Sequence, residues 1–126
     1  MSQTVPQRAT ATVRENRTVG VEQWRELVAA YLVNPDDWLR IMGCESNGNP
    51  ESHNLNPNTG DDSVGLFMIN LAGGNLPGRL QHLRALGYDV WDRESAVAVL
   101  KQPEANIRMA NLLSAGGHQT GQWSCR

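Results

Sequence analysis

Carboxylates suited to acid–base chemistry occur at two places in the sequence, Glu45 and the pair Asp61-Asp62. Glu45 ends an apolar helical stripe that includes Ile41 and Met42. An apolar setting and the negative end of a helix dipole both disfavour a carboxylate, so we expect the pKa of Glu45 to be raised. The aspartate pair follows in a polar, turn-rich stretch, which keeps an aspartate ionised. Two carboxyl groups in such different settings are the arrangement that cleaves glycosidic bonds.

The residues before Glu45 predict the helix that would position it. Asn34 is expected to be the N-cap and Pro35 the first helical residue, with two aspartates in the first turn. Trp38, Ile41 and Met42 then fall on one face. The helix is expected to stop where the chain enters a Ser-Asn-Gly-Asn-Pro turn, directly after Glu45.

The rest of the chain predicts an α+β fold that is predominantly α-helical. A helix is expected from Val21, and further helices over about 76–86, 93–100 and 103–115. Residues 51–63 predict turns and a small irregular hairpin. The apolar run 64–70 fits either a strand or the buried start of a helix. We therefore expect one domain over 20–126, preceded by a flexible polar arm over 1–19.

Composition excludes several classes of function. The chain has 126 residues, 40% of them hydrophobic, and a net charge of −2 without a basic patch, so neither nucleic acid nor membrane is expected as a partner. His53, His82 and His118 lack metal-site spacing, and no metal or cofactor is expected. Cys44 and Cys125 lie 81 residues apart, and their spacing fits either one disulfide or two free thiols.

Three segments carry a resemblance to a known family. The stretch 44–70 resembles the core of the lysozyme superfamily, in which a helix ends in Glu-Ser, a short hairpin follows, and a Gly-Leu-Phe-Gln-Ile-Asn-like run closes it. The sequence PEANIRMANLL resembles the downstream helix of the soluble lytic transglycosylases. Cys-Glu-Ser together with the terminal Gln-Trp-Ser-Cys resembles the resuscitation-promoting factors, in which a disulfide joins these segments. The resemblance covers about residues 36–125.

The resemblance implies a lysozyme-like fold and a peptidoglycan glycosidase, either a muramidase or a lytic transglycosylase. Such an enzyme cleaves the β-1,4 bond between N-acetylmuramic acid and N-acetylglucosamine. Glu45 would be the catalytic acid, and Asp62 or Asp61 the second carboxylate. Cys44 and Cys125 would form a disulfide that closes the C-terminus over the catalytic helix. Hydrolysis and formation of a 1,6-anhydro product both remain open.

The resemblance also implies a set of substrate-binding residues. They are Ser46, Gly65, Leu66, Met68, Asn70 and Asn106. Met68 stands where the pattern usually has glutamine, and Asp62 lies three residues before Gly65, where animal-type lysozymes have their aspartate two before. The tyrosine-containing motif that ends the transglycosylase pattern is absent. The methionine and the displaced aspartate favour the alternative, a catalytically inactive glycan-binding or virion structural module.

The expected place of action is the bacterial cell wall. The polar N-terminus has no apolar signal-peptide region, so a bacteriophage protein is expected, either tail-associated in the virion or an endolysin released during host lysis. Its partner would be bacterial peptidoglycan, with other phage tail proteins contacting the N-terminal arm in the virion case.

Overall fold

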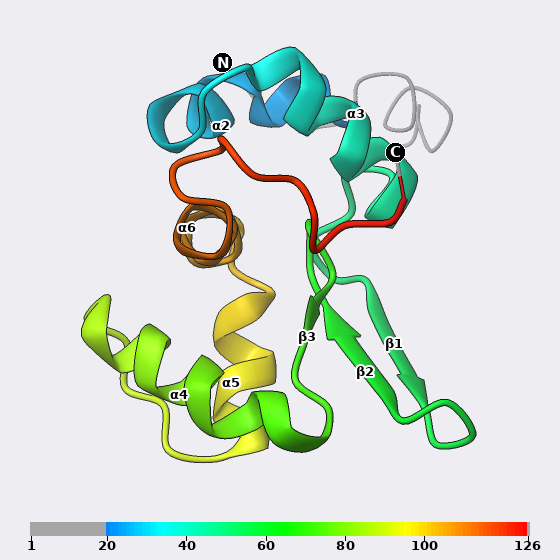
Figure 1. Cartoon of the computed structure of the whole chain (residues 1–126), viewed down its shortest axis with the longest axis vertical. Helices are drawn as coiled ribbons and strands as arrows, with labels where there is room; N and C mark the ends of the chain where they lie inside the picture. The colour runs from blue at the N-terminus through cyan, green and yellow to red at the C-terminus, as the bar shows by residue number, and fades with distance from the viewer. Residues whose placement is uncertain (1–19, 126) are drawn as a thin grey trace, which may run out of the picture.

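In the computed structural model, which describes residues 20–125, helices combine with a small three-stranded antiparallel sheet (Figure 1). The structure is about 51% helical, and the expected α+β class is confirmed. The expected arm over 1–19 lies outside the described residues. In chain order the elements are η1 (Glu22–Trp24), α2 (Arg25–Tyr31), α3 (Pro35–Ser46), β1 (His53–Asn56), β2 (Asp61–Val64), β3 (Ile69–Asn70), η2 (Gly73–Asn75), α4 (Leu76–Ala85), α5 (Arg93–Leu100) and α6 (Pro103–Leu113).

Helix α3 begins and ends close to where the sequence predicts. Pro35 is its first residue and Ser46 its last. Asn34 is the N-cap, as expected, although its backbone is left-handed (φ 57°) and its side chain makes no capping hydrogen bond. At the other end Asn47 is also left-handed (φ 55°), and its N–H donates to the carbonyls of Met42 and Gly43. This turn leaves Glu45 in the last turn of the helix.

The apolar run 64–70 forms neither one strand nor a helix start. Val64 ends β2, a turn follows, and Ile69–Asn70 form β3 antiparallel to β2. Two left-handed residues make the turn possible, Gly65 (φ +84°) and Met68 (φ +47°). The hairpin expected within 51–63 is confirmed, with His53 paired to Val64 in the β1–β2 register.

Helix α6 lies at the centre of the helical part. It contacts α2, α4, α5 and strand β3. Trp38, Phe67 and Trp123 form edge-to-face ring contacts in the core, with centroid separations of 4.9 to 6.4 Å. Trp38 is fully buried, as its apolar face predicts. Helices from both halves of the chain and the C-terminal segment therefore share one core.

The later helices match the sequence prediction closely. The observed α4, α5 and α6 cover 76–85, 93–100 and 103–113. Asp92 caps α5, because its side chain accepts from the N–H of Ser95 while the Ser95 hydroxyl is bonded to the Asp92 backbone. No helix among residues 20–125 is long and apolar enough to cross a membrane.

Candidate functional site

Glu45 lies in an environment that favours its protonated form. It is half-buried in the last turn of α3, one turn after the fully buried Met42. Burial is the main cause that raises the pKa of Glu45 above its ordinary value, and the charge of Asp61 raises it further. A hydrogen bond from the backbone N–H of Cys125 acts in the opposite direction, but the net pKa shift is upward. A carboxyl group with a raised pKa stays protonated to a higher pH, which suits it to donate a proton.

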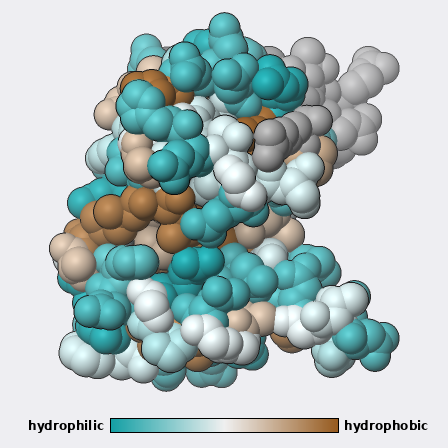
Figure 2. Space-filling view, in the orientation of Figure 1, coloured by the Kyte–Doolittle hydropathy of each residue, from teal (hydrophilic) through white to brown (hydrophobic). Residues whose placement is uncertain are grey.

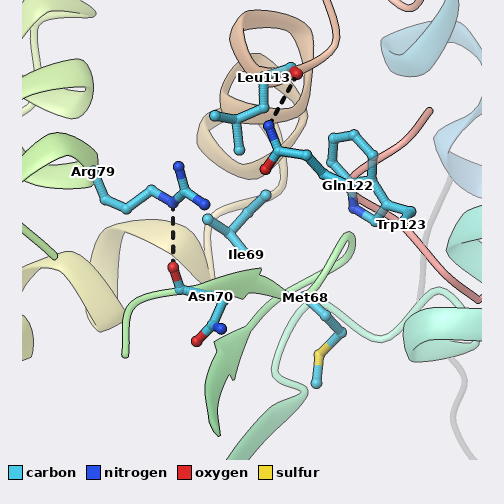
Figure 3. A pocket seen from close by; sticks show the side chains of 7 residues that line it. All are labelled: Met68, Ile69, Asn70, Arg79, Leu113, Gln122 and Trp123. Carbon is cyan, nitrogen blue, oxygen red and sulfur yellow. Dashed lines mark hydrogen bonds between the residues drawn. The ribbon is translucent and has the colours of Figure 1, made fainter. Parts of the chain in front are cut away.

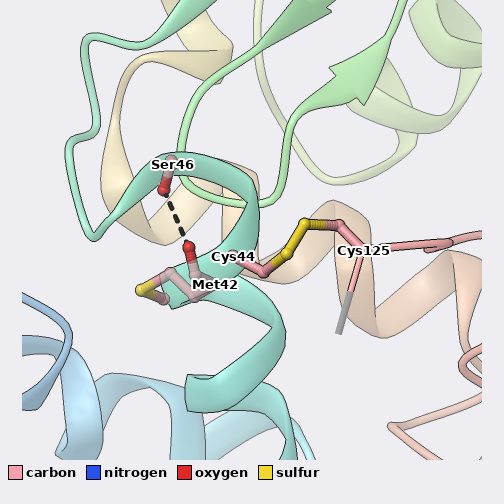
Figure 4. The surroundings of a disulfide bond; sticks show 4 residues. All are labelled: Met42, Cys44, Ser46 and Cys125. Atoms are coloured by element: carbon pink, nitrogen blue, oxygen red, sulfur yellow. Dashed lines mark hydrogen bonds between the residues drawn. A yellow bond between two sulfur atoms is a disulfide. The ribbon is translucent and has the colours of Figure 1, made fainter.

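The C-terminal segment closes against α3 beside Glu45. A disulfide joins Cys44 to Cys125, with 5.6 Å between the Cα atoms (Figure 4), and the expected bridge is confirmed. Two residues earlier, Trp123 is buried and its indole N–H donates to the Phe67 carbonyl at 2.9 Å. These two attachments hold the segment in place and bring the Cys125 N–H to the Glu45 carboxylate.

Asp62 is occupied by two basic side chains. It is only 3% exposed, and its oxygens lie 2.6 Å from Nε2 of His53 and 2.5 Å from the Arg93 guanidinium. Burial acts to raise the pKa of Asp62, but hydrogen bonds from His53 and Arg93 outweigh it, so the pKa is lowered. The carboxylate therefore ties β2 to β1 and to the start of α5, and neither oxygen is open to a substrate.

Asp61 is the aspartate whose charge acts on Glu45. It is half-buried at the start of β2 and accepts hydrogen bonds from Asn54 and Ser63, each 2.7 Å long. Its negative charge contributes to the raised pKa of Glu45. Of the two candidate second carboxylates, the structure thus brings Asp61 into the electrostatic field of Glu45.

An open pocket lies between β3, α4, α6 and the C-terminal segment (Figure 3). It holds about 250 Å³ of empty space. The residues that line it are Met68, Ile69, Asn70, Arg79, Leu113, Gln122 and Trp123. In Figure 2 the hydrophobic side chains on this face gather across the middle of the molecule, over α6, with hydrophilic ones above and below.

Two of the expected substrate-binding residues line this pocket, Met68 and Asn70. Met68 does so from a left-handed backbone (φ +47°), a conformation that is unfavourable for a methionine and is often found at functional sites. Gly65 and Leu66 are buried and are not among the residues that line it, so their expected contact with the substrate stays a prediction.

The side chains of Ser46 and Asn106 form hydrogen bonds with the turn after β2. The Ser46 hydroxyl donates to the Leu66 carbonyl at 2.7 Å. Asn106 has no exposed surface, and its amide is bonded to the backbone of Val64, Phe67 and Leu100. Every polar atom of the Asn106 side chain is thus bonded to the protein interior, and its expected contact with the substrate stays a prediction.

Sequence reasoning missed Arg79 and Gln122 as pocket residues. Arg79 lies in a helix whose apolar face is weakly marked, so nothing in the local pattern distinguishes it from a solvated arginine. Trp123 is 4% exposed and lines the pocket by its edge, whereas Trp91 is 70% exposed on the loop before α5.

Within residues 20–125 no group of three or more histidine, cysteine, aspartate or glutamate side chains could hold a metal ion. No protein-family model, curated protein or solved structure matches the chain.

Proposed function

We propose that this protein is a lysozyme-like peptidoglycan glycosidase with Glu45 as its general acid. The observation that carries the proposal is the half-buried position of Glu45 at the end of α3, next to the C-terminal segment, where burial raises its pKa. A glutamic acid of this kind protonates the oxygen of the β-1,4 bond that leaves N-acetylmuramic acid. The small antiparallel sheet that follows the helix, and the pocket lined by Met68 and Asn70, support a glycan as the substrate.

The contacts of the aspartates favour the route that needs one carboxyl group. Asp62 is held by His53 and Arg93, and both oxygens of Asp61 accept hydrogen bonds. In this route the N-acetyl oxygen of the substrate attacks the anomeric carbon while Glu45 protonates the leaving oxygen. The Glu45 carboxylate then takes the proton of the C6 hydroxyl, whose oxygen displaces the N-acetyl oxygen. A 1,6-anhydro sugar results, and no water is consumed.

Hydrolysis is the competing outcome of the same acid. There Asp61 would stabilise the positive charge that develops on the sugar, and water would add to the anomeric carbon. A second candidate function is a catalytically inactive glycan-binding or virion module, which Met68 favours because it stands at the usual glutamine position. The Cys44–Cys125 disulfide supports action outside a reducing cytoplasm, as expected for a phage lysin that meets the cell wall.

Mass spectrometry of the fragments released from purified peptidoglycan tests the proposal. The protein is compared with Glu45→Gln and with a control, Glu51→Gln, which changes an exposed glutamate on the loop before β1. We expect anhydro ends from the protein and from the control, and none from Glu45→Gln. Reducing N-acetylmuramic acid ends would instead assign hydrolysis. Binding of peptidoglycan without any fragments would overturn the enzymatic proposal in favour of the binding module.

A further inference from the structure

Arg79 is a half-buried cation without an acidic partner. Its Nε donates to the Asn70 carbonyl at 3.2 Å, and its terminal nitrogens make no hydrogen bond or ion pair within residues 20–125. Other described arginines are held by carboxylates or lie against aromatic rings: Arg25, Arg40, Arg84, Arg93 and Arg108. Arg79 therefore keeps four N–H donors that the described protein does not use.

Placing a cation in this position has a measurable consequence. Burial lowers the pKa of the Arg79 guanidinium from its ordinary value, which reflects the loss of hydration without a compensating charge. A buried charge without a partner is unfavourable, and an anion that enters the pocket would offset this desolvation. The Nε contact with Asn70 fixes the plane of the guanidinium, so its remaining donors are oriented in advance.

The walls of the pocket define what kind of anion fits. Figure 3 shows the Arg79 side chain reaching from α4 toward the middle of the pocket. Met68, Leu113 and Trp123 supply apolar and aromatic surface around it. Gln122 closes the rim, held by its amide nitrogen, which donates to the Leu113 carbonyl at 3.3 Å. A planar anion attached to an apolar group would bind the guanidinium N–H donors of Arg79 while its apolar part contacts these side chains.

We infer that Arg79 binds a carboxylate of the substrate and makes the site selective for acidic glycans over neutral ones. The inference rests on the proposed function, because it names which feature of the glycan the same site recognises. A peptidoglycan strand carries free carboxyl groups on its stem peptides, and on the lactyl ether of each muramic acid that lacks a stem peptide. A chitin-type strand of N-acetylglucosamine alone carries none.

The test is a double-mutant-type cycle, in which the guanidinium of Arg79 and the carboxylates of the substrate are removed separately and together. Cleavage rates are measured on native peptidoglycan and on peptidoglycan whose carboxyl groups have been converted to amides, with the protein and with Arg79→Gln. We expect amidation to lower kcat/KM of the protein by about 10- to 100-fold, the range for a hydrogen-bonded charge pair. For Arg79→Gln the same amidation changes kcat/KM by less than about threefold, because the partner is already missing.

A matched control separates this contact from general charge effects. Arg84→Gln removes one half-buried positive charge from the same helix, at a side chain that bonds Val90 and stacks on Trp91. Arg84→Gln retains the full response to amidation if the contact is specific to Arg79. Equal responses to amidation in the protein and in both variants would overturn the inference. If Arg79→Gln fails to fold, Arg79→Met, which keeps the apolar stem, takes its place.

Two further arms identify the carboxylate and keep the inference distinct from the proposed function. Glycan stripped of its stem peptides exposes free lactyl carboxylates. If the Arg79-dependent preference for the carboxylate form over the amidated form remains on this stripped glycan, the lactyl group is the ligand. If the preference is lost, the carboxylate of the stem peptide is the ligand. Binding is also followed by NMR with N-acetylmuramic acid and N-acetylglucosamine as probes. If the protein cleaves nothing but binds only the acidic probe through Arg79, the enzymatic proposal fails and the inference stands. Equal binding of both probes, together with a response to amidation that does not depend on Arg79, overturns it.

Discussion

Replacing Asn106 by leucine removes the side chain that connects α6 to the turn after β2. Asn106 is fully buried, accepts from the Phe67 N–H at 2.8 Å, and donates to the carbonyls of Val64 and Leu100 at 2.8 and 2.9 Å. Leucine has a similar size but no polar atoms, so three backbone groups lose their partners in the interior.

The loss can be estimated from these three contacts. Each hydrogen bond contributes about 0.5–1.5 kcal/mol, and a buried group left without a partner adds to this, so we expect the free energy of unfolding to fall by about 3–5 kcal/mol. Since small domains are stable by only about 5–15 kcal/mol, the variant would be marginal. For a domain of this size the melting temperature should fall by about 12 °C or more.

Urea unfolding followed by circular dichroism measures this effect. The matched control is Asn111→Ala on the same helix, which removes one side-chain hydrogen bond, to the Tyr31 carbonyl, and should lower the stability by about 1 kcal/mol. A loss below about 1 kcal/mol for Asn106→Leu would refute the structural role. An unchanged stability with lost cleavage would instead support the direct substrate contact that the family resemblance implies for Asn106.

Three other perturbations have defined outcomes. Reducing the Cys44–Cys125 disulfide reopens a loop of 81 residues and should lower the stability by about 4–5 kcal/mol, seen as a lower melting temperature in reductant. Gly65→Ala, at φ +84°, places a Cβ 2.1 Å from a side-chain nitrogen of α6. It should therefore lower the free energy of unfolding several-fold more than Gly73→Ala, whose Cβ meets nothing within 4 Å. The urea midpoints of the two variants measure this difference. Asp62 has a lowered pKa in the folded state, so the stability that its carboxylate contributes is present above pH about 4 and is lost as the pH falls through the folded pKa. The urea midpoint of Asp62→Asn should therefore depend less on pH in that range than the midpoint of the unchanged protein.

Local signals predicted most of the helices. Prolines at the first position mark the starts of α3 and α6, and the apolar spacing after them gives their buried faces. The run 64–70 stayed ambiguous because its course depends on left-handed residues at Gly65 and Met68. These conformations are supported by contacts with distant parts of the chain, which no local pattern contains.

The site was predictable only where a single residue and its own helix decide its environment. Glu45 follows an apolar stripe, so its raised pKa could be anticipated from the sequence. Asp62 is held by Arg93, 31 residues away, and Asn106 bonds a backbone N–H 39 residues away. Such partners depend on tertiary packing, so the contacts of both side chains could not be read from the local sequence.

The most direct test of the central claim is the pKa of the Glu45 carboxyl group, followed by carbon-13 NMR during a pH titration of the folded protein. We predict a midpoint above the ordinary glutamate value of about 4.3, because burial and the charge of Asp61 disfavour the carboxylate. The cleavage rate should fall on the alkaline side with the same midpoint, since only the protonated form can donate. A midpoint at or below the ordinary value, or a cleavage rate that does not follow the titration of Glu45, would contradict its assignment as the general acid.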